Sequence, residues 1–467
     1  MKLIIDSQLT LTDIPEEFKL WFMEQLTFDN PVYLEAVKRG RYTRNIPEYL
    51  TSYRTLPNGI VVPRGYLQVI EDAFIGQGYG VDIVDNRVLT APIKTESSIK
   101  LFPYQAEAKY KILSHPNGML IAPAASGKTI MGLDIIASTY QKALWITHTD
   151  RLAKQVIDRI VGTDDMPAAF PNISREDIGM LGGGKFKIGD HITIGMVPTL
   201  VRRDIELLSI GKEFGIVILD EAHHAPASTF LRVLSYFSSF YMYGLTATPH
   251  RRDKLENLMF AAIGMPNSKI FRKTVKKEGK IITPKVIVRK VPSMVIETND
   301  FQYIMREIIP ANKGRLEMIV KDIVREAKDG NYCIVISTRK NYCEMLFEKL
   351  KQELPDKIGI ATGDYRRTLN DNTVSKIESG EFSVLVTTFE LLGEGFDVRK
   401  LNRGFIALPF REKSRVEQAV GRIQRTCENK KDAILYDYVD ENIGILKNQF
   451  LHRALTYSRL GMEIIND

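Results

Sequence analysis

The sequence predicts an α/β protein in which a small N-terminal αβ domain precedes two domains built on parallel sheets. Two observations carry this prediction. Short apolar runs alternate with helical or polar stretches over residues 100–250, and the same pattern returns over 312–440. Strands that alternate with helices in this way are typical of parallel sheets covered on both faces. A chain of 467 residues is also long enough for about three domains.

Composition narrows the class of protein. Hydrophobic residues make up 44% and charged residues 26%, as in folded soluble proteins. No apolar stretch approaches the roughly 18 residues of a membrane span, and we expect a folded N-terminus, not a signal peptide. Three scattered cysteines indicate a reducing, cytoplasmic compartment without a disulfide framework. The net charge of +7 is a weak indication of a polyanionic partner.

The N-terminal region has mixed αβ character. A helix is expected over 15–28, and a turn, a strand and a second helix are expected over 54–74. The run Lys38–Arg44 interleaves basic residues with one tyrosine, a pattern that suits contact with nucleic acid. The region as a whole is not basic, so such a surface would be a local patch. A solvated basic loop is the alternative.

The two α/β domains are defined by their apolar runs. Strands are expected in the first domain within 118–124, 142–148, 191–197, 215–222 and 240–248, and in the second within 332–338, 357–363, 383–389, 404–409 and 433–439. A segment over 266–311 would bridge them. Within it, Phe271–Lys290 carries eight basic residues and one acid, which predicts either a solvated strand or hairpin or an edge that faces a polyanion.

A candidate phosphate-binding loop follows the first of these strands. The stretch Ala122–Thr129, APAASGKT, lies between an apolar run and a helical pattern. In such a strand–loop–helix unit, the backbone N–H groups of Ala125, Ser126 and Gly127 face a phosphate at the N-terminus of the helix. Lys128 would contact the β- and γ-phosphates, and the Thr129 hydroxyl would bind Mg²⁺. Ala122 departs from the usual pattern, which has glycine at that position.

A second half of the same site is predicted at the end of the strand 214–220. Asp220 would hold the metal through water, and Glu221 would polarise the attacking water. A strand that simply ends in charged turn residues is the alternative. His223 is expected to couple nucleotide state to Thr246 and Thr248. Zinc binding by the neighbouring histidines is disfavoured because no third ligand lies at a suitable spacing.

These motifs resemble those of superfamily 2 helicases of the DEAH/DExH type, and the resemblance runs in order over 100–440. It implies that Gln105 reads adenine and that Arg422 and Arg425 act as arginine fingers, with Gln418 in the same motif. It also implies nucleotide contacts from the Gly-Glu-Gly-Phe-Asp stretch. The remaining implied residues are Gly395 and Asp397 for the nucleotide, and Lys185, Thr199, Arg339 and Thr387 for the nucleic-acid backbone.

The arginine motif can also be interpreted physically. Gln418, Arg422 and Arg425 are spaced four and three apart, so on a helix they would share one face. A surface helix with solvated arginines is the alternative. Arginines that face a transferred phosphate stabilise the charge that develops there, and their planar fork suits this better than lysine does. The nucleotide would then lie between the two sheet domains, and its hydrolysis would drive their opening and closing.

The resemblance is nearest to UvsW-type phage branch-migration helicases and XPB-like translocases. It implies two tandem RecA-like P-loop domains, with a DNA-binding accessory domain at 1–95, motor domains at 96–265 and 312–467, and a linker at 266–311. The implied activity is ATP- and Mg²⁺-dependent remodelling or unwinding of double-stranded or branched DNA, in recombination, repair or replication. We expect a monomer in the cytoplasm, that of the bacterial host if phage-encoded. The alternatives are an RNA helicase, an ATP-gated clamp that does not unwind, and a small-molecule kinase.

Overall fold

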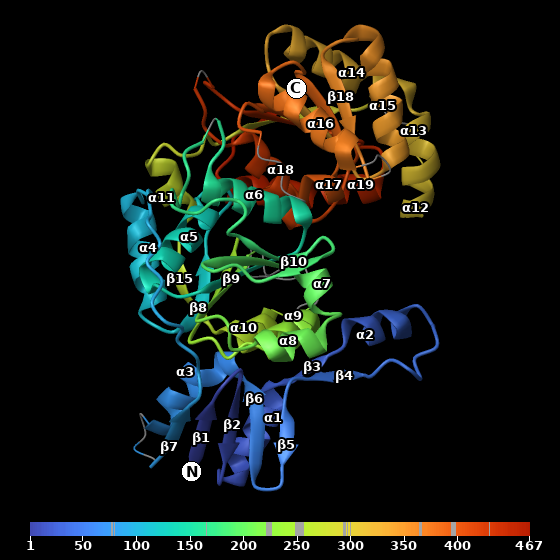
Figure 1. Cartoon of the computed structure of the whole chain (residues 1–467). Helices are drawn as coiled ribbons and strands as arrows, with labels where there is room; N and C mark the ends of the chain where they lie inside the picture. Colours follow the sequence, from blue (N-terminus) through green and yellow to red (C-terminus); the bar gives the residue numbers. More distant parts are fainter. Residues whose placement is uncertain are drawn as a thin grey trace. The chain divides into compact units, whose positions relative to one another are not determined.

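The structure is a computed structural model that falls into two compact units, Met1–Phe271 and Arg272–Asp467 (Figure 1). It describes residues 1–75, 78, 80–164, 166–220, 227–247, 256–292, 296, 298, 300–363, 367–393, 398–428 and 430–467. Among the helices of these residues, none has the length and apolar character needed to cross a bilayer.

The first unit begins with a five-stranded mixed sheet in the order β5-β6-β2-β1-β7. Alternate residues of β1 and β2 are buried, as the two-fold side-chain alternation of a half-covered sheet requires. Helix α1 (Glu16–Gln25) contributes Phe22 to the core of this sheet. The helix expected over 15–28 is thus confirmed, except that its last residues belong to a strand, Thr27–Asp29. The strands are β1 (Lys2–Ile5), β2 (Gln8–Thr12), β5 (Arg54–Leu56), β6 (Gly59–Pro63) and β7 (Asp82–Asp85).

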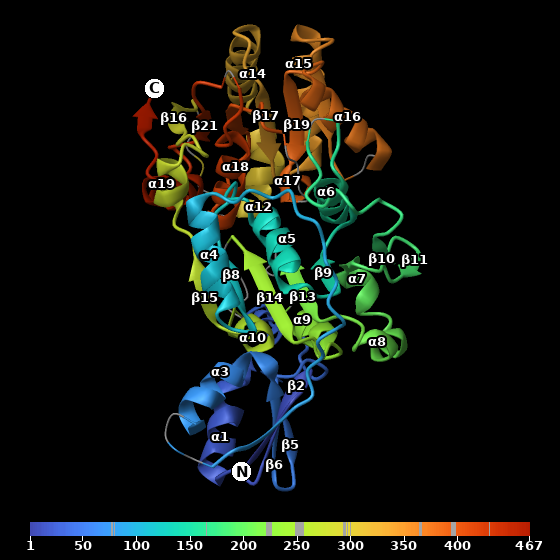
Figure 2. The ribbon, with the colours of Figure 1, turned by 60° about the vertical axis from the view of Figure 1, so that its left-hand side comes forward.

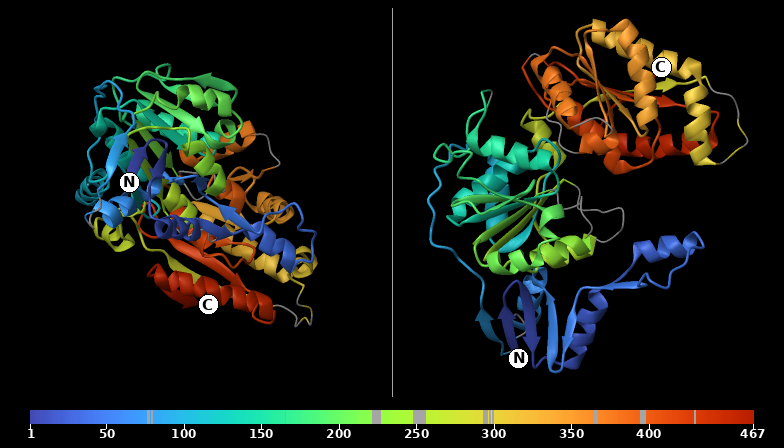
Figure 3. Two further views of the ribbon diagram at one scale, coloured as in Figure 1. Left: turned by 90° about the horizontal axis from the view of Figure 1, so that it is seen from below. Right: turned by 45° about the vertical axis from the view of Figure 1, so that its right-hand side comes forward.

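An arm formed by residues 27–51 extends from this sheet (Figure 3). It consists of the two-stranded ribbon of β3 (Thr27–Asp29) and β4 (Tyr49–Thr51) and of helix α2 (Pro31–Lys38). The helix begins at Pro31 because the Asn30 side chain accepts a hydrogen bond from the Val32 N–H at 3.0 Å. The base of the ribbon packs on the following domain, where Phe28 and Leu50 contact Leu258.

A buried arginine joins the N-terminal sheet to the following domain. Arg64 is 1% exposed and donates hydrogen bonds to the carbonyls of Ser239 and Phe240. Its burial lowers the pKa of the guanidinium to about 9. The next residue, Gly65, lies against α10 (Glu256–Ile263), where an added Cβ would come within 2.2 Å of the Phe260 carbonyl oxygen. The two parts of this unit are therefore in direct backbone contact.

The first parallel sheet has eight strands in the order β11-β10-β12-β9-β13-β14-β8-β15, and only β11 runs antiparallel to its neighbour. One face is covered by α4 (Pro103–Leu113), α5 (Lys128–Thr139) and α6 (Asp150–Val161), and Figure 2 shows α4 and α5 in front of the strands. The other face carries α7 (Val197–Leu200), α8 (Asp204–Ile210), α9 (Ala227–Leu234) and α10. The strands are β8 (Asn117–Ile121), β9 (Ala143–Thr147), β10 (Gly179–Gly182), β11 (Lys185–Lys187), β12 (Ile192–Met196), β13 (Ile216–Asp220), β14 (Tyr241–Thr246) and β15 (Pro266–Lys269).

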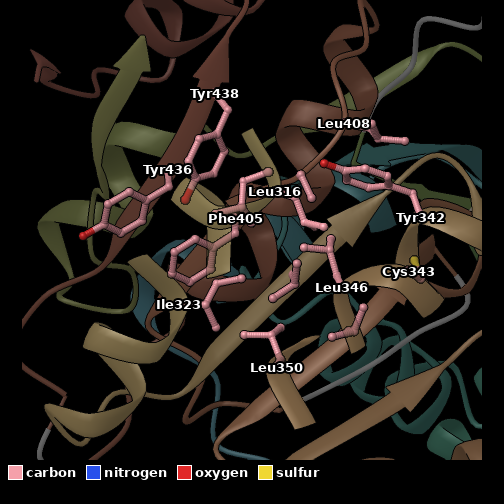
Figure 4. Packing of buried hydrophobic residues seen from close by; sticks show 14 of the residues in the cluster. Leu316, Ile323, Tyr342, Cys343, Leu346, Leu350, Phe405, Leu408, Tyr436 and Tyr438 are labelled. Carbon is pink, nitrogen blue, oxygen red and sulfur yellow. The ribbon is translucent and has the colours of Figure 1, made fainter. Parts of the chain in front are cut away.

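The second unit contains a seven-stranded sheet in the order β18-β19-β17-β20-β21-β16-β22, in which every pair is parallel. Helices α14 (Lys313–Lys328) and α15 (Lys340–Glu353) cover one face, whose core is shown in Figure 4. On the opposite face lie α16 (Arg367–Ser379), α17 (Phe389–Gly393), α18 (Lys413–Ile423) and α19 (Gly444–Arg459). The strands are β16 (Lys285–Lys290), β17 (Cys333–Ser337), β18 (Ile358–Ala361), β19 (Val384–Thr388), β20 (Arg403–Ile406), β21 (Ile434–Val439) and β22 (Ile464–Asn466).

The segment 266–311 is divided between the two sheets. β15 pairs with β8 and extends the first sheet, whereas β16 lies between β21 and β22 inside the second. Helix α11 (Arg272–Lys277) stands between these strands in the sequence. The sequence of β15, Pro-Asn-Ser-Lys, has little strand propensity, so its pairing with β8 selects the strand conformation, whereas β16 has alternating buried residues of its own. The expectation of a solvated strand, a hairpin or an edge within 271–290 is therefore wrong in part, because residues 272–277 form helix α11 and β16 is a paired, half-buried strand inside the sheet.

Candidate nucleotide site and nucleic-acid contacts

The candidate phosphate loop connects the end of β8 to the start of α5, as expected. Ala125 and Gly127 have φ values of +67° and +86°, which turn successive backbone N–H groups along the loop. A Cβ at Gly127 would lie 2.4 Å from the Gln105 side-chain nitrogen, so the position requires glycine. Ala122 is fully buried and its backbone N–H donates to the Thr246 carbonyl at 2.9 Å. Its φ is not positive, which explains why alanine replaces the usual glycine there.

The side chains of the loop fit a bound phosphate. Lys128 is the first residue of α5 and is half-buried, with its Nζ 3.4 Å from the Ala122 carbonyl oxygen. Thr129 follows it in the first turn of the helix. The Ser126 hydroxyl is buried and has no hydrogen-bond partner among the described residues, as expected of a group that waits for a ligand. A helix N-terminus with these donors attracts an anion.

Helix α4 supports the loop from the side. The Gln105 side chain donates to the Ser126 carbonyl at 2.8 Å and accepts from the Phe102 N–H at 2.9 Å. The Tyr104 hydroxyl donates to the same Ser126 carbonyl at 3.2 Å. Gln105 is 4% exposed, which leaves one N–H and one lone pair for a nucleotide base. Tyr104 was not among the predicted site residues; its position beside Gln105 in the sequence was the available signal.

Asp220 lies at the same edge of the sheet as the phosphate loop. It is the last residue of β13, whose neighbour β14 ends at Thr246, and β14 in turn pairs with β8. The carboxyl ends of parallel strands form the usual ligand edge of such a sheet. The Asp220 carboxylate and the Thr129 hydroxyl are hard oxygen donors, the type that Mg²⁺ prefers. Three further predicted residues, Glu221, His223 and Thr248, lie outside the described residues.

The arginine motif lies in the second unit, and one detail of its prediction is wrong. Gln418 and Arg422 are on α18, but the helix ends at Ile423, so Arg425 does not continue the same helical face. The backbone at Arg425 forms an isolated β-bridge with Ile281. This pairing replaces the helical hydrogen bonds that the spacing alone suggested. Gly395 and Asp397, the predicted nucleotide contacts of this unit, lie outside the described residues.

The four predicted nucleic-acid contacts differ in exposure. Lys185 is exposed on the edge strand β11, and Thr199 is partly exposed on α7. Arg339 precedes α15 and donates to the Gln302 side chain at 2.9 Å. Thr387 is completely buried in β19, with its hydroxyl directed to the Thr388 carbonyl. In this arrangement the Thr387 side chain does not reach the surface, because each residue of β19 is covered by helices on both faces.

The second unit contains a buried ion pair between Arg453 and Asp437. Arg453 is buried and donates two hydrogen bonds to Asp437, which also accepts one from the Tyr457 hydroxyl. Burial and the neighbouring carboxylate raise the pKa of Tyr457 well above its usual value. Among the described residues, no group of three His, Cys, Asp or Glu side chains is arranged to hold a metal ion.

Two family models match the chain. Residues 98–251 match a model described as "Type III restriction enzyme, res subunit", and residues 315–427 match "Helicase conserved C-terminal domain". The first match includes the phosphate loop and Asp220. The second runs from α14 to beyond Arg425. The two models together span both parallel-sheet domains in order.

Individual relatives share about a quarter of their residues with the chain. A protein of Acanthamoeba polyphaga mimivirus, named as an ATP-dependent RNA helicase, is 24% identical over 75% of this chain and 66% of its own length. The DNA 3'-5' translocase XPB2 of Sulfurisphaera tokodaii is 25% identical over 77% of this chain and 86% of its own. The ATP-dependent DNA helicase uvsW of Enterobacteria phage T4 is 23% identical, over 72% and 68%. The chain thus spans about two thirds of two of these proteins.

A solved structure supports the fold. The structure of S. cerevisiae Dbp5 bound to RNA and ADP BeF3 aligns with a TM-score of 0.57 and 15% identity. The alignment covers 79% of this chain and 90% of that one. At this level of identity the likeness concerns the fold alone.

Proposed function

The chain belongs to the superfamily 2 helicases, which hydrolyse ATP and move on nucleic acid, and from that premise we propose that it is a DNA translocase that remodels branched DNA. The observation that supports this most directly is the match, in order, of the restriction-enzyme res-subunit model to residues 98–251 and of the helicase C-terminal model to residues 315–427. Its relatives XPB2 and uvsW carry DNA in their names, and uvsW is encoded by a phage. The proposal includes a role in DNA repair or recombination.

In the proposed reaction, ATP occupies the loop 122–129. Lys128 and the backbone N–H groups of the loop would hold the phosphates, and Thr129 and Asp220 would hold Mg²⁺, directly or through water. The ion would neutralise negative charge on the nucleotide phosphates. Gln105 contacts the base. Glu221 orients the attacking water, and Arg422 and Arg425 stabilise the charge that develops on the transferred phosphoryl group.

We propose the arm as the element that favours DNA. Tyr42 is 73% exposed, and Lys38, Arg41 and Arg44 make no ion pair with the described residues, whereas Arg39 pairs with Glu35. Unpaired basic side chains suit a phosphate backbone, and an exposed aromatic ring suits a base that is unstacked at a branch point. Lys185, Thr199 and Arg339 would add backbone contacts that do not depend on sequence.

An RNA helicase is the second candidate, because one relative is named as such. The test is a comparison of ATP hydrolysis and strand rearrangement on duplex DNA, forked DNA, a four-way DNA junction and a forked RNA of the same sequence. We expect the four-way junction and the DNA fork to be rearranged faster than the RNA. Lys128→Ala serves as the control and should abolish both activities. Equal or higher rates on RNA would contradict the proposal, as would ATP-dependent fork binding without strand movement.

A further inference from the structure

Two basic side chains hold the backbone on either side of the Gly-Glu-Gly-Phe-Asp motif, residues 393–397. Before the motif, Arg422 Nη2 donates to the Leu392 carbonyl at 2.7 Å. After it, Lys430 Nζ donates to the Leu401 carbonyl at 2.6 Å and to the Arg399 carbonyl at 3.3 Å. Both basic residues come from the segment that carries the arginine motif. The chain before the motif and the chain after it are therefore tied to one segment.

The start of this region is held in the same way. Arg415 on α18 lies over the ring of Phe389, with the guanidinium carbon 5.3 Å from the ring centre, and its Nη2 is 3.8 Å from the Glu390 carboxylate. Phe389 and Glu390 open α17, directly after β19. A cation over an aromatic face and a nearby carboxylate both favour a fixed approach of α18 to α17. The residues on either side of the motif thus touch the arginine segment at three places along the chain.

Lys430 has the surroundings of a backbone clamp. It is partly buried, and among the described residues it forms no ion pair; its ammonium hydrogens go to the two carbonyls. Burial, together with the nearby charges of Arg425 and Arg403, lowers its pKa to about 8. Its neighbour Lys431 is exposed, as a solvated lysine should be. The hydrogen bonds to these two carbonyls explain how the Lys430 ammonium group can be partly buried near other positive charges.

The other side of the arginine segment is fixed by main-chain contacts. The Ile282 N–H donates to the Gln424 carbonyl at 2.7 Å, and the Thr426 hydroxyl donates to the Lys280 carbonyl at 3.3 Å. The Lys430 N–H closes a turn onto the Cys427 carbonyl at 3.2 Å. Because the segment is anchored at 424–426 and again at its end, a displacement of 398–401 would be transmitted to the backbone that carries Arg425.

We propose that Lys430 is a positioning residue that couples the Gly-Glu-Gly-Phe-Asp motif to the arginine segment, so that nucleic-acid binding accelerates hydrolysis. The inference rests on the proposed function, in which Arg425 acts on the phosphate, and on the nucleotide contacts that the resemblance implies for the Gly-Glu-Gly-Phe-Asp motif. Lys430 itself touches neither. It acts by keeping the backbone after the motif in register with the backbone at Arg425.

The test compares ATP hydrolysis with and without forked DNA in the wild type, in Lys430→Met and in the matched control Lys431→Met. We expect Lys430→Met to keep its DNA-free rate within about two-fold and to lose about five-fold or more of its stimulation by DNA, which is the size of a typical coupling between sites. Lys431→Met should keep full stimulation, and Lys430→Arg, which retains the charge and the donors, should recover part of it. Stimulation in Lys430→Met equal to wild type would overturn the inference.

Hydrogen exchange of the backbone amides of 398–402 gives a second readout that does not depend on DNA. Faster exchange in Lys430→Met than in Lys431→Met supports the clamp, and equal exchange in the two variants overturns it. If the wild type shows no stimulation by DNA, the proposed function fails, and this exchange measurement still decides whether Lys430 holds the loop. A variant with lower thermal stability but unchanged stimulation would show a purely structural role and would also overturn the inference.

Discussion

At the scale of single residues, Ser126 illustrates how the phosphate loop is prepared. Its carbonyl accepts hydrogen bonds from Tyr104 and Gln105, while its hydroxyl is buried without a partner among the described residues. The side chains of α4 therefore restrain the loop, while the Ser126 hydroxyl remains available to a ligand. Each hydrogen bond contributes about 1 kcal/mol, so two of them restrain the loop before the nucleotide arrives.

Arg425 gives the first prediction at this scale. We expect Arg425→Ala to lower the turnover number for ATP by at least about 100-fold, because an arginine at the transferred phosphate acts mainly in the transition state. The KM for ATP should stay within a few-fold. Steady-state kinetics check this, with the exposed Arg411→Ala as the control. Turnover close to wild type in Arg425→Ala would remove the arginine-finger role.

Lys430 gives a prediction for pH. Its pKa is lowered to about 8 in the folded protein, from an ordinary value of 10.5. Between these pH values the unfolded chain binds a proton that the folded chain has released, so this residue makes stability rise as pH increases. Below pH 8 both states are protonated and the burial penalty is present in full. We expect the melting temperature of wild type relative to Lys430→Met to increase from pH 8 to pH 10, by calorimetry. A flat or falling difference would contradict the lowered pKa.

At the scale of elements, the clearest case is the contact between the N-terminal sheet and α10. An added Cβ at Gly65 would come within 2.2 Å of the Phe260 carbonyl oxygen and 2.4 Å of the Ala261 carbonyl oxygen. Backbone atoms cannot move aside as a flexible side chain can. The close approach also brings Arg64 to its two carbonyl partners. The short segment around these two residues therefore acts as the joint between the two parts of the first unit.

We expect Gly65→Ala to destabilise this joint by about 1–3 kcal/mol, the usual cost of inserting a group into a packed site. Limited proteolysis should then release the N-terminal sheet domain more readily. The melting temperature of the first unit should also fall. Gly80→Ala is the matched control, since an added Cβ there meets no atom within 4 Å. Equal proteolysis of the two variants would show that the joint is not close-packed.

At the scale of the whole molecule, the chain contains two units with separate hydrophobic cores. Both tryptophans, Trp21 and Trp145, belong to the first unit, and Trp145 is fully buried in β9. Tryptophan fluorescence therefore reports the first unit alone, whereas far-UV circular dichroism reports both. A cooperative transition of the entire chain would give the same midpoint with both probes.

We predict that the two probes do not coincide. In urea, fluorescence should show one transition, and circular dichroism should show that transition and a second one from Arg272–Asp467. Replacing Trp145 by Phe should remove most of the fluorescence change while leaving two steps in circular dichroism. A single shared midpoint for both probes in the wild type would mean that the units unfold together.

The sequence by itself determined the features that depend on neighbours along the chain. The strand–loop–helix around Lys128, the apolar strand that ends at Asp220 and the alternation of strands and helices are all local patterns. A glycine at a tight turn and a run of apolar residues in a strand can both be recognised directly in the sequence. For the same reason the motifs by themselves indicate the family.

The tertiary structure decided what depends on partners far away in the chain. β15 and β16 lie within 25 residues of each other in the chain, but one extends the first sheet and the other lies inside the second. Arg425 lies outside helix α18 because its backbone pairs with that of Ile281. Thr387 is buried because helices cover both faces of β19. Strand pairing and burial are set by which surfaces meet, and residue type alone does not encode that. The number of charged residues in the sequence could not show that Arg64, Arg315 and Arg453 are buried.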